Sequence, residues 1–574
     1  MELSSVVHYM NESFAFKLGD HQYLIKLRTK RDDIKKVSLK YVEKYLRERN
    51  VKDHPTFTKE MKKVASTSLY DYYEVVISDE FEFFNQKVNM IAVRYYFILE
   101  GKDGEIVFYG NYKYSHKEPY ESIEMFNLVI HQADISYFKT PNWSKGAVFY
   151  QIFPERFAPT DDKYSSTWNE VPMGIQTRTN GTLKGICQKI PYIKDLGVDA
   201  IYLNPIFLSQ TSHRYDTIDY MVIDPLLGSD EDFKELVDTC HKFGIKVVLD
   251  LVFNHSSTKF FAFQDLLINQ ENSKYKDWYF VKQFPISVNF PPNYLGFSFG
   301  PFMPKLNPDN LECREYFLNV TRHYLNDFHV DGYRLDVADE VSHKFWKEFR
   351  KESKKINPEC LIMGEVWYDS TPYLRGDEFD SIMNYTIYDG IRNFLIGKLS
   401  LDQFIDIVER ERGETPLNYY HNSNILVGSH DTDRIYHFLG CNKDKFLIAM
   451  TLLLFLPGSP LIYYGDEIMM DGANDPDCRR GMIFDENFNK DVKETIKNLI
   501  KIKHLTAIRE GEVNTSKFHN KSLKIQRTLG KDTYTLIVAF EKEDLIDLKG
   551  KLNLFNNELF DGTLNPLQIL IYKE

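Results

Sequence analysis

The feature that most constrains the fold is an alternation of short apolar segments with amphipathic ones, beginning at about Gly146. This alternation is typical of βα units, which assemble into a parallel sheet with helices packed outside it. In one amphipathic segment, Phe233, Leu236, Val237 and Cys240 fall on a single helical face. The apolar segments are eight: Ala147 to Ile152, Ala200 to Asn204, Lys246 to Leu251, Gly332 to Asp336, Leu361 to Val366, Ser381 to Tyr385, Ile425 to His430, and Leu461 to Gly465. Eight units in this order predict an α/β chain built around a closed (β/α)8, or TIM, barrel.

The segments outside the predicted barrel follow a different pattern. With 574 residues, of which 43% are hydrophobic, the chain is too long for one domain. Strand-like alternation fills the start of the chain and returns after Leu505. After the third strand, a segment rich in Phe, Tyr, Asn and Pro shows little helical periodicity. We predict an N-terminal β-sandwich (1–124), the barrel (125–255 and 303–504), an inserted subdomain B (256–302) and a C-terminal β-sandwich (505–574).

Charge and cysteine usage narrow the class of protein. The net charge of -12 comes from charges of both signs without a long basic stretch, so we expect no nucleic acid and no membrane as partner. Six cysteines lie far apart without CxxC spacing, which predicts free thiols in a reducing compartment. Glu2 and His8 stand where a secretory signal needs a basic start and an apolar run. We therefore expect a cytoplasmic protein.

Catalytic groups of a (β/α)8 barrel lie at the carboxyl ends of its strands. Several carboxylates around one arginine suit hydrolysis of a glycosidic bond, which needs a proton donor and an anionic partner for an oxocarbenium-like transition state. A metal site is the rival interpretation. It is weaker because the histidines lack HxH or HExxH spacing, so we predict no metal ligands here. The polar residues at these strand ends are Asp250, Asn254, His255, Arg334, Asp336, Glu365, His430 and Asp431.

Four segments at these strand ends carry a specific pattern in chain order: residues 250–255 (DLVFNH), 332–339 (GYRLDVAD), 364–367 (GEVW) and 427–431 (VGSHD). Together they resemble the motifs of the α-amylase family, glycoside hydrolase family 13. Residues 303–307 (MPKLN) and 475–479 (DPDCR) further resemble its cyclomaltodextrinase, neopullulanase and maltogenic amylase group. The resemblance covers nearly the whole chain.

The resemblance implies a retaining α-glucoside hydrolase with Asp336 as nucleophile and Glu365 as general acid and base. Arg334 would hold Asp336 ionised, since a nearby cation favours the charged carboxylate. Asp431 would bind hydroxyls of the distorted sugar, and Asp250 would orient the cluster. The other implied substrate contacts are Tyr215, Asp216, His213, His255 and His430, with Trp367 and His343 on the acceptor side. A solvated loop position for His213, and plain packing for Trp367 and His343, stay open as alternatives.

The implied substrates are cyclodextrins, malto-oligosaccharides and pullulan, cut at α-1,4 bonds with some transfer to sugar acceptors. An α-1,6-glucosidase or a glucanotransferase on the same scaffold stays open, because both use the same machinery. A non-catalytic carbohydrate- or protein-binding barrel is the remote alternative, and the presence of Asp336, Glu365 and Asp431 argues against it. The resemblance also implies a homodimer formed through the N-terminal sandwich.

The implied chemistry requires no cofactor. Relatives often bind calcium beside the first strand through an Asn and Asp cluster and a Gly-Asp pair, whereas here Thr182 follows Gly181. We therefore expect no tight calcium site, although Asp161 and Asp162 leave a loose one open. Met469 also departs from the family, since relatives often have glycine in that stretch.

Overall fold

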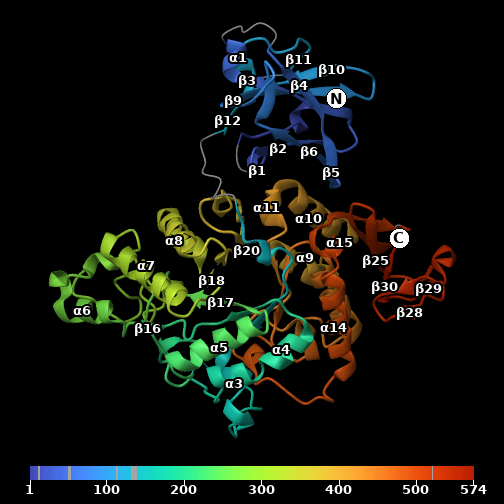
Figure 1. The fold of residues 1–574 in the computed structure, drawn as a ribbon. Coiled ribbons are helices and arrows are strands. Elements are labelled where there is room, and N and C mark those ends of the chain that lie inside the picture. Colours follow the sequence, from blue (N-terminus) through green and yellow to red (C-terminus); the bar gives the residue numbers. More distant parts are fainter. Residues whose placement is uncertain are drawn as a thin grey trace.

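A computed structural model describes residues 1–10, 13–48, 54–111, 114–130, 139–172, 174, 176–519 and 521–574. In this part of the chain, eight parallel strands close into a barrel, which confirms the predicted fold (Figure 1). In barrel order they are β13 (Phe149–Ile152), β14 (Ala200–Leu203), β17 (Lys246–Leu251), β18 (Gly332–Leu335), β19 (Leu361–Gly364), β20 (Ser381–Asn384), β21 (Asn424–Ile425) and β22 (Ser459–Tyr463). The seventh strand differs most from the prediction, because residues 426–430 form a loop instead of extending β21.

Amphipathic helices pack outside the barrel. Helix α5 (Asp230–Lys242) begins at a capping box in which the Ser229 hydroxyl accepts from the Asp232 amide. The face predicted from its sequence is buried, since Phe233, Leu236, Val237 and Cys240 all lie in the core. The other long helices of this layer are α7 (Leu311–Asn326), α8 (His343–Ile356), α9 (Tyr385–Leu395), α10 (Leu401–Glu414), α13 (Lys443–Phe455) and α14 (Lys490–Lys503).

The N-terminal region folds as two facing antiparallel sheets. One sheet has the order β1 (Ala15–Gly19), β2 (Gln22–Lys30), β6 (Tyr70–Ser78), β5 (Lys62–Ser66). The other has the order β11 (Tyr114–Ser115), β10 (Ile106–Tyr109), β9 (Ala92–Gly101), β3 (Ile34–Glu43), β4 (Thr56–Glu60), with β12 (Phe126–Val129) also pairing with β9. Buried side chains of both sheets, such as Leu27, Leu39 and Phe97, form one apolar cluster. The region is therefore a β-sandwich.

Two further regions complete the chain. The segment after β17 contains helix α6 (Phe261–Asn269), a helix that the sequence pattern did not reveal, and short bridges tie Tyr279 to Leu306 and Gly296 to Pro304. At the C-terminus, β23 (Glu512–Phe518), β24 (Ser522–Leu529), β25 (Asp532–Val538) and β30 (Ile569–Lys573) form an antiparallel sheet. No helix in the described part of the chain is long and apolar enough to cross a bilayer.

Helix α10 joins the three regions, and Figure 1 shows the N-terminal sandwich next to α10 and α11 (Leu417–Tyr420). The buried Arg412 guanidinium binds Glu74 of β6 at 2.8 Å and Glu512 of β23 at 3.1 Å. Lys26 of β2 donates from Nζ to the carbonyls of Gly413 at 3.1 Å and Thr415 at 2.8 Å. The sandwich and the C-terminal sheet are thereby fixed to the side of the barrel.

Candidate active site

Strand register brings the predicted residues to one end of the barrel. Asp250 of β17 pairs with Arg334 of β18, and the next strand, β19, is followed directly by Glu365. Asp336 follows β18, and its amide donates to Leu251 at 3.0 Å. Because neighbouring parallel strands end at the same edge, these side chains converge at the carboxyl end of the barrel.

Arg334 is the centre of the cluster and is fully buried. Its Nη1 lies 2.8 Å from Asp336 Oδ1 and 3.1 Å from Asp250 Oδ1, and its Nη2 lies 2.7 Å from Glu365 Oε1. One guanidinium therefore faces three carboxylates. With an excess of negative charge in a buried site, the cluster binds a proton more tightly than separate carboxyl groups would.

The charge excess modifies the role that we predicted for Arg334. Burial raises the pKa of Asp336 well above its ordinary value, and the nearby Glu365 and Asp250 raise it further, although Arg334 acts in the opposite direction. Burial also raises the pKa of Asp250 to about 6, against the opposing charge of Arg334. The charge of Arg334 thus opposes the rise in the pKa of Asp336 without cancelling it.

Glu365 is held by donors on both of its oxygens. The Val337 amide donates to Oε2 at 2.9 Å, and Trp367 Nε1 donates to Oε1 at 3.2 Å. Val337 has a φ of 44°, a left-handed conformation that costs a β-branched residue energy. This strained backbone, directly after Asp336, is what aims the amide at Glu365. The Trp367 ring stacks on Tyr385, with ring centroids 3.8 Å apart.

Two tyrosine hydroxyls bind Asp250, and a histidine binds one of these tyrosines. Tyr202 and Tyr215 donate from their hydroxyls to Asp250 Oδ2 at 2.6 and 2.8 Å. The Tyr215 hydroxyl also contacts His430 Nε2 at 2.6 Å, and the Gln151 amide lies 2.8 Å from His430 Nδ1. Burial lowers the pKa of His430 well below its ordinary value, so the ring is neutral. These contacts fix the orientation of Asp250 and of the Tyr215 ring.

Asp431 is positioned by Arg479, a residue absent from our predicted site. Arg479 Nη2 lies 3.2 Å from Asp431 Oδ1, and its Nε donates to the His430 carbonyl at 2.8 Å. Arg479 Nη1 also pairs with Asp475 at 2.7 Å. Arg479 belongs to residues 475–479, the motif that resembles the cyclomaltodextrinase group. Its contact with Asp431 could not be predicted, because the two residues lie far apart in the sequence.

These groups face a cavity of about 470 Å³. Its imidazoles are His213 and His255, and burial lowers the pKa of each to about 3, so both are neutral hydrogen-bonding groups. The His255 ring stacks on Phe297 of the inserted segment, with centroids 4.9 Å apart. The cavity is lined by His213, Tyr215, His255, Phe297, Met303, Asp336, Val337, Asp339, Glu340, Glu365, Trp367, Tyr368, Asp431, Asp475 and Arg479. It combines the two carboxyl groups of Asp336 and Glu365 with aromatic rings in one cleft, as hydrolysis of a glycosidic bond requires.

Some predicted residues do not line the cleft. Arg334, Asp250 and His430 lie beneath its floor, where they support the lining groups. Asp216 is turned into its own loop, where the hydroxyls of Ser209 and Thr211 donate to it. His343, at the start of α8, pairs with Glu378 at 2.8 Å and stacks on Tyr373. The structure thus gives Asp216 and His343 local partners away from the cavity.

The two aspartates considered for calcium binding, in the segment after β13, have protein partners. Asp162 Oδ1 pairs with Lys189 at 2.7 Å and accepts from the Tyr164 hydroxyl at 3.0 Å. Asp161 Oδ1 accepts from Gln188 Nε2 at 2.8 Å. These carboxylates face a lysine and an amide donor, whereas calcium requires a shell of oxygen ligands.

Comparisons with known proteins agree with this geometry. Residues 151–511 match the model of the α-amylase catalytic domain, and residues 1–131 match that of the α-amylase N-terminal ig-like domain. Neopullulanase 2 of Thermoactinomyces vulgaris is 38% identical over 524 residues, covering 90% of this chain and 87% of that protein. The cyclomaltodextrinase of Geobacillus thermopakistaniensis is 36% identical, covering 99% and 97%.

A solved structure named cyclomaltodextrinase superposes over the whole chain. The TM-score is 0.90 at 32% identity, with 100% of this chain and 98% of that chain covered. The match includes the N-terminal sandwich and the C-terminal sheet as well as the barrel. The chain therefore belongs to the α-amylase family and is a glycoside hydrolase of its cyclomaltodextrinase, neopullulanase and maltogenic amylase type.

Proposed function

We propose that the chain hydrolyses α-1,4 bonds of cyclodextrins and malto-oligosaccharides, and those of pullulan, with retention of configuration. The observation that carries this proposal is the placement of Asp336 and Glu365. They follow adjacent barrel strands, contact the same guanidinium and open into the same cleft. The names of the relatives support the substrate class.

In the proposed first step, Asp336 attacks the anomeric carbon while Glu365 transfers its proton to the departing glycosidic oxygen. The Asp336 oxygen forms a bond to the sugar as the bond to the leaving oxygen breaks. In the second step, Glu365 takes a proton from water, which displaces Asp336 and releases an α-anomeric product. Arg334 stays in contact with both carboxylates throughout and balances the negative charge that moves between them.

Asp431 and its neighbours bind the sugar in this proposal. The Arg479 contact directs the Asp431 carboxylate into the cleft, where it would accept from sugar hydroxyls. The Tyr215 ring, held by His430 and Asp250, offers an aromatic face to the sugar at the cleavage point. Neutral His213 and His255 would donate hydrogen bonds without adding charge that opposes the oxocarbenium-like transition state.

The acceptor side supports some transfer of sugar as well as hydrolysis. Trp367 is 42% exposed and Tyr368 81% exposed, and both lie at the rim of the cleft next to Glu365. Aromatic rings at this point would hold an acceptor sugar in competition with water. A barrel that merely binds carbohydrate would not need the three carboxylates around Arg334.

Three further properties belong to the proposal. The chemistry needs no cofactor, because the nucleophile and the acid are both side chains. The six free cysteines support a reducing, cytoplasmic location.

Three exposed phenylalanines support a homodimer that buries the inserted segment. Phe290, Phe299 and Phe302 of this segment are each more than 70% exposed. A light-scattering mass of twice the chain would agree with the dimer, and the mass of one chain would contradict it.

The function is tested by incubating the protein separately with β-cyclodextrin, maltohexaose and pullulan and identifying the products. Opening of the cyclodextrin to maltose and glucose is the expected result. Cleavage restricted to the α-1,6 bonds of pullulan would indicate a debranching enzyme instead. Asp336→Asn, checked for folding by circular dichroism, should lose nearly all turnover, whereas a pure binding protein would keep its function.

A further inference from the structure

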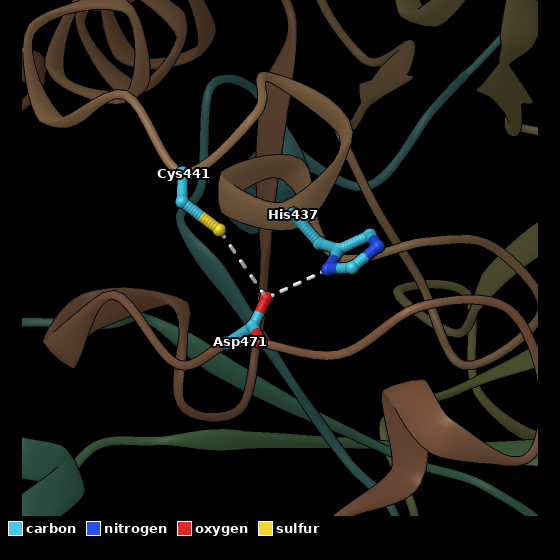
Figure 2. Close-up of side chains that lie close together, drawn as sticks. All are labelled: His437, Cys441 and Asp471. Carbon is cyan, nitrogen blue, oxygen red and sulfur yellow. Dashed lines mark hydrogen bonds and ion pairs between the residues drawn. The ribbon is translucent and has the colours of Figure 1, made fainter.

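A group of potential metal ligands lies outside the lining of the cleft. Figure 2 shows His437, at the end of α12 (Ile435–Phe438), and Cys441 both directed at Asp471 of the segment after β22. One ligand atom from each of the three residues lies within 4.8 Å of the others. None of the three takes part in the proposed reaction.

Two of the distances between these ligand atoms can be compared with the spacing around a bound ion. His437 Nδ1 lies 2.8 Å from Asp471 Oδ1, and Cys441 Sγ lies 3.8 Å from the same oxygen. In tetrahedral zinc sites, with bonds of about 2.0 to 2.3 Å, neighbouring ligand atoms are about 3.3 to 3.6 Å apart. To admit an ion, the His437 and Asp471 atoms would move apart by about 0.5 Å, and the Cys441 and His437 atoms, which lie within 4.8 Å of each other, would take up the same spacing.

The backbone turns so that these ligands face one another. Gly440 and Cys441 adopt left-handed conformations, with φ of 69° and 57°, which turn the chain back after His437. The Arg434 amide donates to the Gly472 carbonyl at 3.0 Å, so the helix and the Asp471 segment are joined beside the cluster. The buried Arg434 side chain also pairs with Asp466 at 3.0 Å and donates to the carbonyl of Cys478 at 2.9 Å.

A second arginine orients the carboxylate. Arg480 Nη1 lies 3.5 Å from Asp471 Oδ2, and Arg480 is itself fixed by Asp477 at 2.6 Å. Oδ1 is thus left facing the histidine and the cysteine. Side chains that contact metal ligands, without binding the metal, commonly orient those ligands. Here Oδ2 of Asp471 pairs with Arg480, and Oδ1 faces His437 and Cys441.

We propose that His437, Cys441 and Asp471 bind a divalent transition-metal ion of the zinc class. Nδ1, Sγ and Oδ1 would supply three ligands, and water would complete the tetrahedron. A thiolate and an imidazole favour zinc or cobalt over calcium or magnesium, which take oxygen ligands. The ion would join α12 to the segment 471–480, whose other end holds Arg479 against Asp431. The site would stabilise this wall of the cleft without entering the reaction.

Cobalt binding tests the proposal directly. Chelator-treated protein titrated with Co²⁺ should take up an ion with a thiolate-to-metal absorption band, and the ion should raise the thermal unfolding midpoint. Zn²⁺ should remove the band by competition. Cys441→Ser should abolish the band and His437→Gln should weaken binding at least tenfold, while both keep full activity on cyclodextrin.

Cys187→Ser is the matched control, because Cys187 is a partly buried free thiol outside the cluster. It should keep the band. Absence of a band in the folded, active protein would overturn the proposal, as would a band that persists in Cys441→Ser or disappears in Cys187→Ser.

Discussion

Asp336 and Glu365 share one guanidinium but differ in their other contacts. Glu365 also accepts from the Val337 amide and from Trp367, which fix both of its oxygens. For Asp336, the side-chain donor found among the described residues is Arg334, at Oδ1. Asp336 can therefore direct its other oxygen at the anomeric carbon, whereas Glu365 is held in a fixed position beside it.

Glu365→Gln should lower kcat on maltohexaose by about 10² to 10⁴-fold, because a general acid contributes a factor of that size. A substrate with a good leaving group, such as α-glucosyl fluoride, does not need a proton from Glu365. The rate of its first step should therefore fall much less. Steady-state kinetics on both substrates measures the difference. Asp336→Asn is the matched control, and it should be inactive on both; equal losses for the two substrates in Glu365→Gln would contradict the assignment.

The raised pKa values in the cluster predict the acid side of the pH profile. Burial raises the pKa of Asp250 to about 6, and activity should fall as the pH drops through this range, well above the ordinary aspartate value of about 3.9. The Tyr202 hydroxyl donates to the ionised Asp250, so Tyr202→Phe should move the acid limb to higher pH. The profile of kcat/KM against pH measures both; an unmoved limb in Tyr202→Phe would mean that Asp250 does not control it.

The site could be predicted from sequence where a residue follows a strand of the barrel. Asp336 and Glu365 fall in the cleft because each directly follows a barrel strand, whereas Asp431 reaches the cleft on the loop after β21, where Arg479 holds it. Asp216 and His343 belong to a loop and a helix start, and the side-chain direction there depends on partners such as Thr211 and Glu378. Arg479 and the strained Val337 were missed because their roles rest on distances across the fold.

At the scale of elements, strand β19 places Glu365 through close packing at Gly364. A Cβ at this position would lie 2.4 Å from the Phe379 ring, so Gly364→Ala must displace the strand or the ring. We expect a stability loss of about 1 to 3 kcal/mol from overpacking. We also expect a loss of up to about 10²-fold in kcat/KM from misplacement of Glu365. Denaturant unfolding and kinetics measure the two effects; unchanged activity would contradict this role of Gly364.

Helices and strands with a strong hydrophobic periodicity could be predicted from the sequence, and those with an irregular pattern could not. Helix α5 has both a capping box and a four-residue apolar face in its sequence, and it forms as expected. Strand β21 ends at Ile425, and residues 426–430 form a loop that places His430 beneath the cleft and leads to Asp431 in its lining. Helix α6 was not predicted because its own apolar residues are spread around the helix and do not form a single face. Met469 has a φ of 57°, which accounts for the glycine that relatives often have in this stretch.

At the scale of the whole molecule, Arg412 connects the barrel to both β regions. Arg412→Met would leave Glu74 and Glu512 without their partner between the regions. Removing one partner of a buried ion pair costs about 3 kcal/mol or more, although the partial exposure of Glu512 reduces its share. The thermal midpoint should fall by several degrees. Arg410→Met, at an exposed position of the same helix, is the control and should leave it nearly unchanged.

The central claim is retention of configuration through Asp336 and Glu365, and the anomeric form of the first product tests it most directly. Proton NMR during the first minutes of β-cyclodextrin or maltohexaose cleavage, before mutarotation, should show the α-anomer accumulating ahead of equilibrium. Initial accumulation of the β-anomer would mean inversion by a water molecule, and the double displacement at Asp336 would then be wrong.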